Sequence, residues 1–255
     1  MITRYGVWID GQGLQDIDPA IYITDIIEEA PDEPFEIAPL SGYEGSRITS
    51  RARRSLMVTV HFAIREYDVM RRRSILQKVR EWAQDGWLTT SEHQDQRLRV
   101  VCTGLPVISS AQKWTEQLAV QFTAFALPYW QEMYPVTASG GGTSGTLYLR
   151  PMGTRPCRLE FTVTGKGISA TQIIVKANGK KLQFEGVAVT KDEPLVVEYT
   201  DDGILTAKCG DTGVLGKRTL GSGDDIWLDP NKENKITYES DAAIGITLKA
   251  RGIWR

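Results

Sequence analysis

Two stretches of the chain alternate apolar and polar residues over about a dozen positions, the period of a long half-buried strand. Within residues 53–65 one face carries the apolar side chains Leu56, Val58, Val60, Phe62 and Ile64, and residues 117–127 repeat the alternation. The period changes after Asp68, where apolar residues recur every three or four positions, which predicts an amphipathic helix over 69–84. Together these elements predict an N-terminal β-sandwich with one α-helix on its flank.

The second half of the chain shows short alternating segments separated by turn signals. Asn178-Gly179 and Asp202-Gly203 are strong hairpin turns, because both residues tolerate positive φ. No helical period is found in this half, so we expect a jelly roll or a related β-sandwich there. Small polar residues fill 137–146, the composition of a linker, which predicts two domains at 1–136 and 147–255.

Charge is balanced in sum but separated along the chain. The 255 residues have a formal net charge of −2, which does not favour nucleic acid as a partner, and no apolar run suits membrane insertion. Residues 1–46 nevertheless hold ten acids and one base, whereas residues 47–80 hold ten bases and two acids. These stretches either neutralise each other within one fold or form complementary faces on neighbouring copies. We expect Arg71, Arg72 and Arg73 to point mostly toward solvent.

The second alternative defines a set of candidate subunit-interface residues. Arginine dominates the basic stretch, and it is the residue preferred for ion pairs at interfaces. The candidates are Arg53, Arg54, Arg65, Arg71, Arg72, Arg73, Asp25, Glu28 and Glu29.

The sequence offers little for catalysis or metal binding. The two histidines and three cysteines lack metal-ligand spacing, and no nucleophile elbow or phosphate-binding loop is present. We therefore predict no catalytic residues, no metal and no cofactor. The three widely spaced cysteines and the lack of a signal-peptide pattern favour synthesis in a reducing cytoplasm. Trp227 is a weak candidate for stacking on a sugar.

The order of several segments resembles a known family. The run RRSLMVTVHFAI, the helix RRRSILQKVREWAQ, the strand RLRVVCTG and the final QLAVQFTAFALPYW are similar to the distal tail proteins, called Dit, of long-tailed phages. Leu127 stands where the family often has Asp. IWLDPNKENKITY and the terminal RGIWR also resemble family segments, although Asn231 replaces a glycine.

This resemblance implies a structural role without catalytic residues. Dit proteins form a hexameric ring at the tip of the tail tube through the N-terminal domain. Their galectin-like or carbohydrate-module-like C-terminal domain holds receptor-binding or baseplate proteins, and sometimes touches the host surface. The expected partners are thus further copies of the chain, the tail-tube protein, tail-tip or hub proteins, receptor-binding or baseplate proteins and, in some cases, a host glycan. The expected location is the virion tail tip, after synthesis in the host bacterium.

Two other classes of function stay open. A carbohydrate-binding or host-surface adhesion module would fit the β-rich second half. A glycosidase with an accessory module would require two carboxylates that converge in a cleft.

Overall fold

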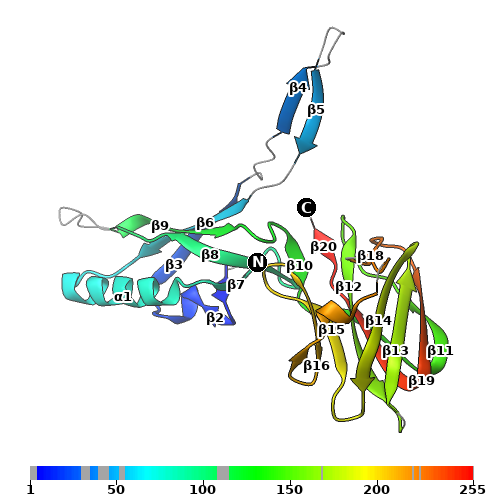
Figure 1. The fold of residues 1–255 in the computed structure, drawn as a ribbon. Helices are drawn as coiled ribbons and strands as arrows, with labels where there is room; N and C mark the ends of the chain where they lie inside the picture. The colour runs from blue at the N-terminus through cyan, green and yellow to red at the C-terminus, as the bar shows by residue number, and fades with distance from the viewer. Residues whose placement is uncertain are drawn as a thin grey trace. The chain divides into compact units, whose positions relative to one another are not determined.

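The computed structural model divides the chain into two compact units, Met1–Tyr129 and Trp130–Arg255 (Figure 1). We call them unit 1 and unit 2. Both consist mainly of antiparallel strands, and the described part of the chain contains one α-helix. The expected mainly-β, two-part, sandwich-like fold is thereby confirmed. The structure describes residues 5–29, 35–39, 46–51, 55–107, 115–167, 169–219, 221–223 and 225–254.

Unit 1 contains an antiparallel sheet with the strand order β2-β1-β7-β8-β9-β6-β3. The two alternating segments form the neighbouring strands β6 and β9, which pair from Leu56 opposite Ala124 to Ile64 opposite Thr115. Both strands turn fully buried phenylalanines into the core. The strands are β1 (Val7–Ile9), β2 (Gln12–Gly13), β3 (Ile21–Glu28), β6 (Leu56–Ile64), β7 (Gly86–Thr90), β8 (Gln96–Gly104) and β9 (Thr115–Ala124).

Helix α1 (Val69–Trp82) packs its apolar stripe on the core of unit 1. It begins as expected, because the Asp68 carboxylate accepts a hydrogen bond from the Met70 N–H at 2.9 Å, and it ends two residues before position 84. The Trp82 ring meets Phe122 edge to face, with 5.9 Å between ring centroids. Its Nε1 donates to the Gln12 carbonyl at 2.7 Å.

One expectation about this helix is wrong. Arg71 and Arg73 are exposed, but the Arg72 side chain is buried, with 7% of its surface accessible. The cause is helical spacing, since position 72 lies three and four residues before Ile75 and Leu76 and thus shares their buried stripe. The aliphatic stem of arginine tolerates this position.

A two-stranded sheet follows β3 in the chain. Strand β4 (Phe35–Pro39) pairs with β5 (Ser46–Arg51) in an antiparallel ladder, and neither pairs with another strand among the described residues. Pro39 occupies the last position of β4, where a missing N–H disturbs the ladder little.

Unit 2 is one curled antiparallel sheet around a single hydrophobic core. The strand order is β14-β13-β19-β12-β15-β16-β17, with β11 paired to β19 and β18 paired to β12. The strands of this sheet are β11 (Val136–Leu149), β12 (Cys157–Gly165), β13 (Ala170–Ala177), β14 (Lys180–Val189), β15 (Leu195–Tyr199), β16 (Leu205–Cys209), β17 (Thr212–Gly213), β18 (Trp227–Leu228) and β19 (Asn234–Ala250). Two short strands of unit 2, β10 (Trp130–Glu132) and β20 (Ile253–Trp254), lie outside this sheet and pair with each other.

The predicted linker 137–146 is part of strand β11, so that expectation is wrong. Strand β11 pairs with β19 from Val136 opposite Ala250 to Leu149 opposite Asn234, with one irregularity between Gly142 and Ser144. On its other edge β19 pairs with β13 through residues 236–240 and with β12 through residues 244–250. Strand β19 therefore links β11 on one edge to both β13 and β12 on the other.

The glycines of β11 serve packing rather than flexibility. A Cβ atom on Gly145 would lie 2.5 Å from the Tyr238 hydroxyl, and one on Gly140 would lie 3.2 Å from it. Tyr238 is buried beneath this backbone, and its hydroxyl donates to the Gly141 carbonyl at 3.1 Å. Gly142 has a φ of +122°, which a residue with a side chain rarely adopts.

We expect Gly145→Ala to destabilise the protein by about 1–3 kcal/mol, because the new methyl group must displace the Tyr238 ring. Urea unfolding of the full chain measures the change. Gly213→Ala is the matched control, since a Cβ atom at that strand position meets nothing within 4 Å. Equal unfolding midpoints for the two variants would show that Tyr238 does not require a glycine at position 145.

Candidate subunit-contact surface

Strand β3 forms the edge of the sheet in unit 1 and pairs only with β6 among the described residues. Its ladder shifts register between Ile23 and Asp25, as at a β-bulge. Tyr22 and Ile27 are 43% and 42% exposed on this edge. An edge strand offers unpaired backbone donors and acceptors, and here it also offers apolar surface for a partner.

Some of the predicted interface arginines bind acids or aromatic rings of their own unit. The Arg71 Nε lies 3.1 Å from the Glu66 carboxylate, and its guanidinium lies 3.9 Å from Asp18. The Arg65 guanidinium stacks over the Tyr22 ring at 4.4 Å from the centroid. Asp18 belongs to the acidic stretch and Arg71 to the basic one, so part of the charge separation is neutralised within the fold.

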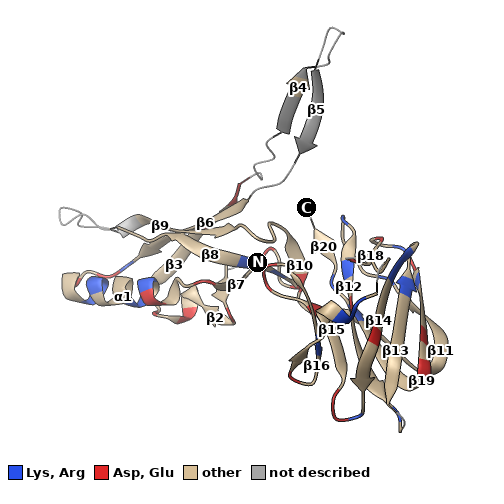
Figure 2. Cartoon of the chain, in the orientation of Figure 1, with Lys and Arg blue, Asp and Glu red and all other residues tan. Residues whose placement is uncertain are grey.

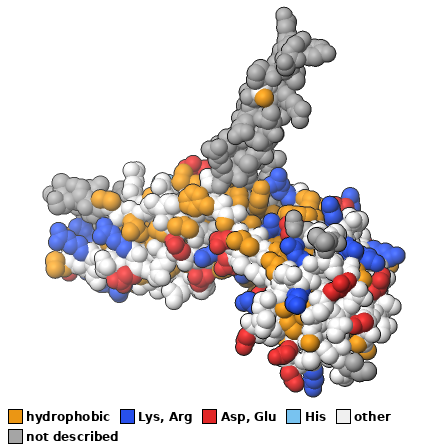
Figure 3. Space-filling view, in the orientation of Figure 1, with side chains coloured by type: hydrophobic (Ala, Val, Ile, Leu, Met, Phe, Trp, Pro, Cys, Tyr) orange, Lys and Arg blue, Asp and Glu red, His pale blue; other side chains and the backbone are white. Residues whose placement is uncertain are grey.

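Other charges keep no such partner. Asp25, Glu29 and Arg73 are exposed, and none of them forms an ion pair with another described residue. The Asp25 carboxylate accepts a hydrogen bond from the neighbouring Ile26 N–H at 2.9 Å. Figure 3 shows basic side chains gathered over α1. Arg53 and Arg54, also predicted for the interface, lie outside the described residues.

Glu28, at the end of β3, binds a histidine of the turn between β7 and β8. The His93 Nε2 lies 3.3 Å from the Glu28 carboxylate, and Nδ1 lies 3.0 Å from the Gln96 side-chain oxygen. Burial alone would lower the pKa of His93, but the hydrogen bonds to Glu28 and Gln96 and the charges of Glu28 and Glu92 raise it above its ordinary value. The His93–Glu28 pair is therefore strongest when the imidazole is protonated.

In unit 2 the Arg158 guanidinium lies between two aromatic rings. Its central carbon is 4.7 Å from the Tyr199 ring centroid and 4.9 Å from that of Trp227. Asp225 accepts from the Tyr199 hydroxyl at 3.0 Å and lies 3.7 Å from the Arg158 Nε. Burial, together with the Asp225 charge, raises the pKa of Tyr199. Trp227 is 40% exposed and partly engaged by Arg158, so sugar stacking stays a prediction.

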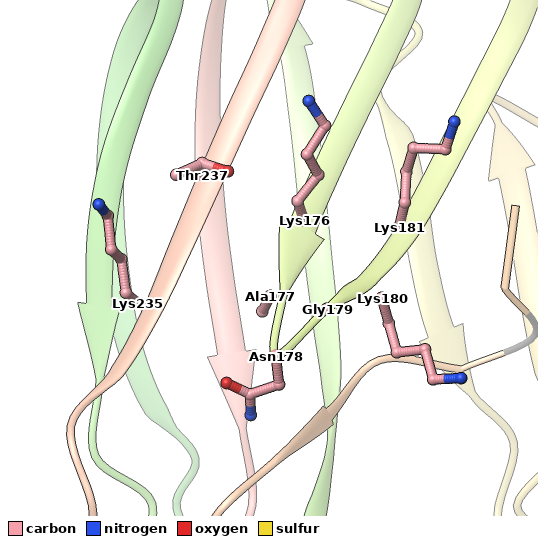
Figure 4. Close-up of a pocket in the computed structure, with 8 residues that line it drawn as sticks. All are labelled: Lys176, Ala177, Asn178, Gly179, Lys180, Lys181, Lys235 and Thr237. Atoms are coloured by element: carbon pink, nitrogen blue, oxygen red, sulfur yellow. The ribbon is translucent and has the colours of Figure 1, made fainter.

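A shallow hollow at the β13–β14 turn was not found by sequence reasoning. It has a volume of about 410 Å³ and is lined by Lys176, Lys180, Lys181, Lys235 and residues of the Asn178-Gly179 turn (Figure 4). The adjacent Lys180-Lys181 pair after a hairpin turn is the one signal in the sequence. Lys235 reaches the hollow only through the register of β19, which the sequence does not reveal.

The described residues provide no group of three or more His, Cys, Asp or Glu side chains that could hold a metal ion. The three cysteines are free, and burial raises the pKa of the Cys157 thiol to about 12, which keeps it protonated at neutral pH. In the part of the chain that the structure describes, no helix is long and apolar enough to cross a membrane.

The fold can be compared with solved structures. The Dit protein of phage SPP1, described as a paradigm of the hub adsorption apparatus in phages that infect Gram-positive bacteria, matches 97% of this chain and 98% of its own length. The TM-score is 0.72 at 12% sequence identity. The chain has the Dit fold. The sequence resemblance to the Dit family is thus confirmed at the level of the fold.

Two further structures match more weakly. Chains of the phage P2 baseplate in its activated conformation, with Ca and with Sr, give TM-scores of 0.48 and 0.46 at 7% identity. They cover 94% and 92% of this chain, and 98% and 97% of their own lengths. No protein-family model and no curated protein matches the sequence.

We expect the His93–Glu28 pair to make stability depend on pH. Because the pKa of His93 is raised in the folded state, its contribution is fully present below the ordinary value near 6.5 and is lost as pH rises through the folded-state pKa. The contribution is about 0.5–1 kcal/mol, since both side chains are partly exposed.

Urea unfolding at pH 5.5 and at pH 8.5 tests this expectation. His93→Gln should lose stability mainly at the lower pH, and Glu28→Gln should do the same because it removes the partner. If Glu28→Gln left unchanged the difference in unfolding free energy between pH 5.5 and pH 8.5, the His93–Glu28 pair would not be the source of that difference.

Proposed function

We propose that the chain is a structural protein of a phage tail tip. In this proposal copies of unit 1 form a ring at the end of the tail tube, and unit 2 holds receptor-binding or baseplate proteins. The partners would be further copies, the tail-tube protein and tail-tip or hub proteins. The protein would act in the virion after synthesis in the host bacterium, and the proposal assigns it no catalytic step.

The observation that carries the proposal is the extent of the match to the SPP1 Dit protein. The match extends through 97% of this chain and 98% of that protein, so it includes the folds of both units. A shared fold does not fix a function, and the function therefore depends on surfaces of this chain.

Three features of unit 1 support self-association. The exposed edge of β3 carries Tyr22 and Ile27, which suit burial against a second copy. A two-stranded sheet such as β4–β5 is marginal on its own in water and gains stability against a partner. Asp25 and Arg73, which form no ion pair with another described residue, have opposite signs, which favours a head-to-tail contact and hence ring closure. The number six comes from the resemblance to Dit proteins alone.

A carbohydrate-binding or adhesion module is the second candidate function. The exposed Trp227 ring beside the polar groups of Arg158 and Asp225 is the observation that favours it. Binding of a glycan by the full chain, lost in Trp227→Ala, would support this role.

We expect the purified full-length protein to form a ring. Light scattering across concentration should find a species of about 170 kDa, six times the 28.4 kDa chain, and negative-stain images should show a central opening. High salt should shift the equilibrium toward the monomer, because screening weakens charged contacts. A monomer at every concentration in low salt would contradict self-association through unit 1.

We also expect charge-reversal variants to show whether Asp25, Glu29 and Arg73 lie in a contact between subunits or on a face that stays in solvent. Asp25→Lys/Glu29→Lys and Arg73→Glu should each weaken assembly by about tenfold or more, because each places like charges at the contact. An equal mixture of the two proteins should restore assembly, since each interface then joins opposite charges.

Asp192→Lys/Asp211→Lys is the matched control, because both residues are exposed in unit 2. It should assemble like the unmodified protein. Normal assembly of the Asp25/Glu29 and Arg73 variants on their own would show that these charges lie outside the contact.

A further inference from the structure

A row of polar side chains crosses the outer face of unit 2 near the β13–β14 turn. Lys181 lies opposite Lys176, which lies opposite Thr237, which in turn lies opposite Thr146. Directly opposed residues share one face of a sheet, so the row spans β14, β13, β19 and β11. Lys235 lies two residues before Thr237 in β19, so its side chain is on the same face, and it lies opposite Tyr148 of β11. We call this surface the lysine face; Lys180, opposite the buried Ala177, does not belong to it.

The lysine face holds more positive charge than its surroundings neutralise. Lys176 lies 2.8 Å from the Glu239 carboxylate, but Lys181 and Lys235 form no ion pair with any described residue. Figure 2 shows this charge at the turn end of β13 and β14. Like charges on adjacent strands destabilise a sheet, so the arrangement costs stability until an anion binds.

The base of the hollow is held in place by hydrogen bonds. Asn178 and Gly179 have φ values of +47° and +73°, and the Asn178 side-chain amide donates to the Trp227 carbonyl at 2.9 Å and to the Asn234 side-chain oxygen at 3.0 Å. In Figure 4 the Lys176 and Lys181 side chains extend side by side in the same direction. Their backbone positions are thus fixed before any ligand arrives, which lowers the cost of binding.

We propose that the lysine face binds a linear anionic polysaccharide that carries phosphate or sulfate groups. Neighbouring strands lie about 4.8 Å apart, so Lys181, Lys176 and Lys235 present charges at intervals over about 10 Å, which suits a chain of repeated anions. Tyr148 is 52% exposed beside Lys235 and offers an aromatic face to a sugar ring. The hydroxyls of Thr237 and Thr146 can bind sugar hydroxyls.

The residue types favour a polymer over an acidic protein. Lysine is a flexible point charge that binds phosphate, whereas arginine prefers fixed bidentate pairs. Lysine is also depleted from protein–protein interfaces. The inference goes beyond the tail-tip role and does not depend on ring assembly, so either can fail without the other.

Titration of the full-length protein with labelled dextran sulfate and with phosphorylated dextran tests the proposal and distinguishes the two anion types. Binding in 50 mM salt that is strongly reduced in 500 mM salt is the expected result, with no binding to neutral dextran. Equal binding of polyglutamate of matched charge would overturn the proposal in favour of an acidic protein partner. Failure of both anionic dextrans to bind would also overturn it.

Variants locate the site. Lys181→Gln/Lys235→Gln should weaken binding by about tenfold or more, because it removes two charges near the ligand. Lys191→Gln/Lys208→Gln makes the same charge change at exposed positions elsewhere in unit 2 and should leave binding unchanged. Tyr148→Ser should weaken binding to the anionic dextrans but not to inorganic polyphosphate. Equal losses in the two lysine pairs would assign binding to net charge and overturn the site, provided that thermal unfolding shows all variants folded.

Discussion

The pairing of β11 with β19 is the constraint on which unit 2 depends. One edge of β19 holds β11 along its whole length, and the other holds β13 and β12 in succession. Buried Tyr238 can lie under this pair only because β11 presents glycine backbone to it. The Asn178 turn follows β13 and Arg158 lies on β12, and both strands pair with β19. Strand β19 therefore positions both the lysine face and the Arg158 guanidinium beside Trp227.

In unit 1 the degree of exposure decides which charges are available to a partner. Arg71 binds Glu66 and Asp18, whose side chains are only 16% and 13% exposed, so these charges stabilise the start of α1. Asp25 and Arg73 have no comparable partner among the described residues and are exposed. Part of the charge separation is thus satisfied within the fold, and part stays exposed to solvent on the described residues of unit 1.

The sequence predicted the elements whose signal is local. The alternation of β6 and the cap and stripe of α1 needed only neighbouring residues, because their periods differ and Asp68 supplies a recognisable N-cap. Strand β11 was missed since glycines that admit Tyr238, almost a hundred positions away, look like a flexible linker. The lysine face was missed for a related reason: β19 brings Lys235 beside residues of β13 and β11 through a register that no local pattern encodes.

The two units also differ in their basic residues, because unit 1 contains mainly arginine and unit 2 mainly lysine. The two side chains make different kinds of contact. Residues 1–138 contain twelve arginines and two lysines, whereas the remainder contains six arginines and ten lysines. Arginine in unit 1 makes fixed contacts, as Arg71 does with Glu66 and Arg65 with Tyr22. In unit 2, Lys181 and Lys235 form no ion pair with any described residue and lie near a turn that Asn178 anchors. A rigid repeated contact between identical subunits requires the first arrangement, whereas a ligand of variable conformation is better bound by the second.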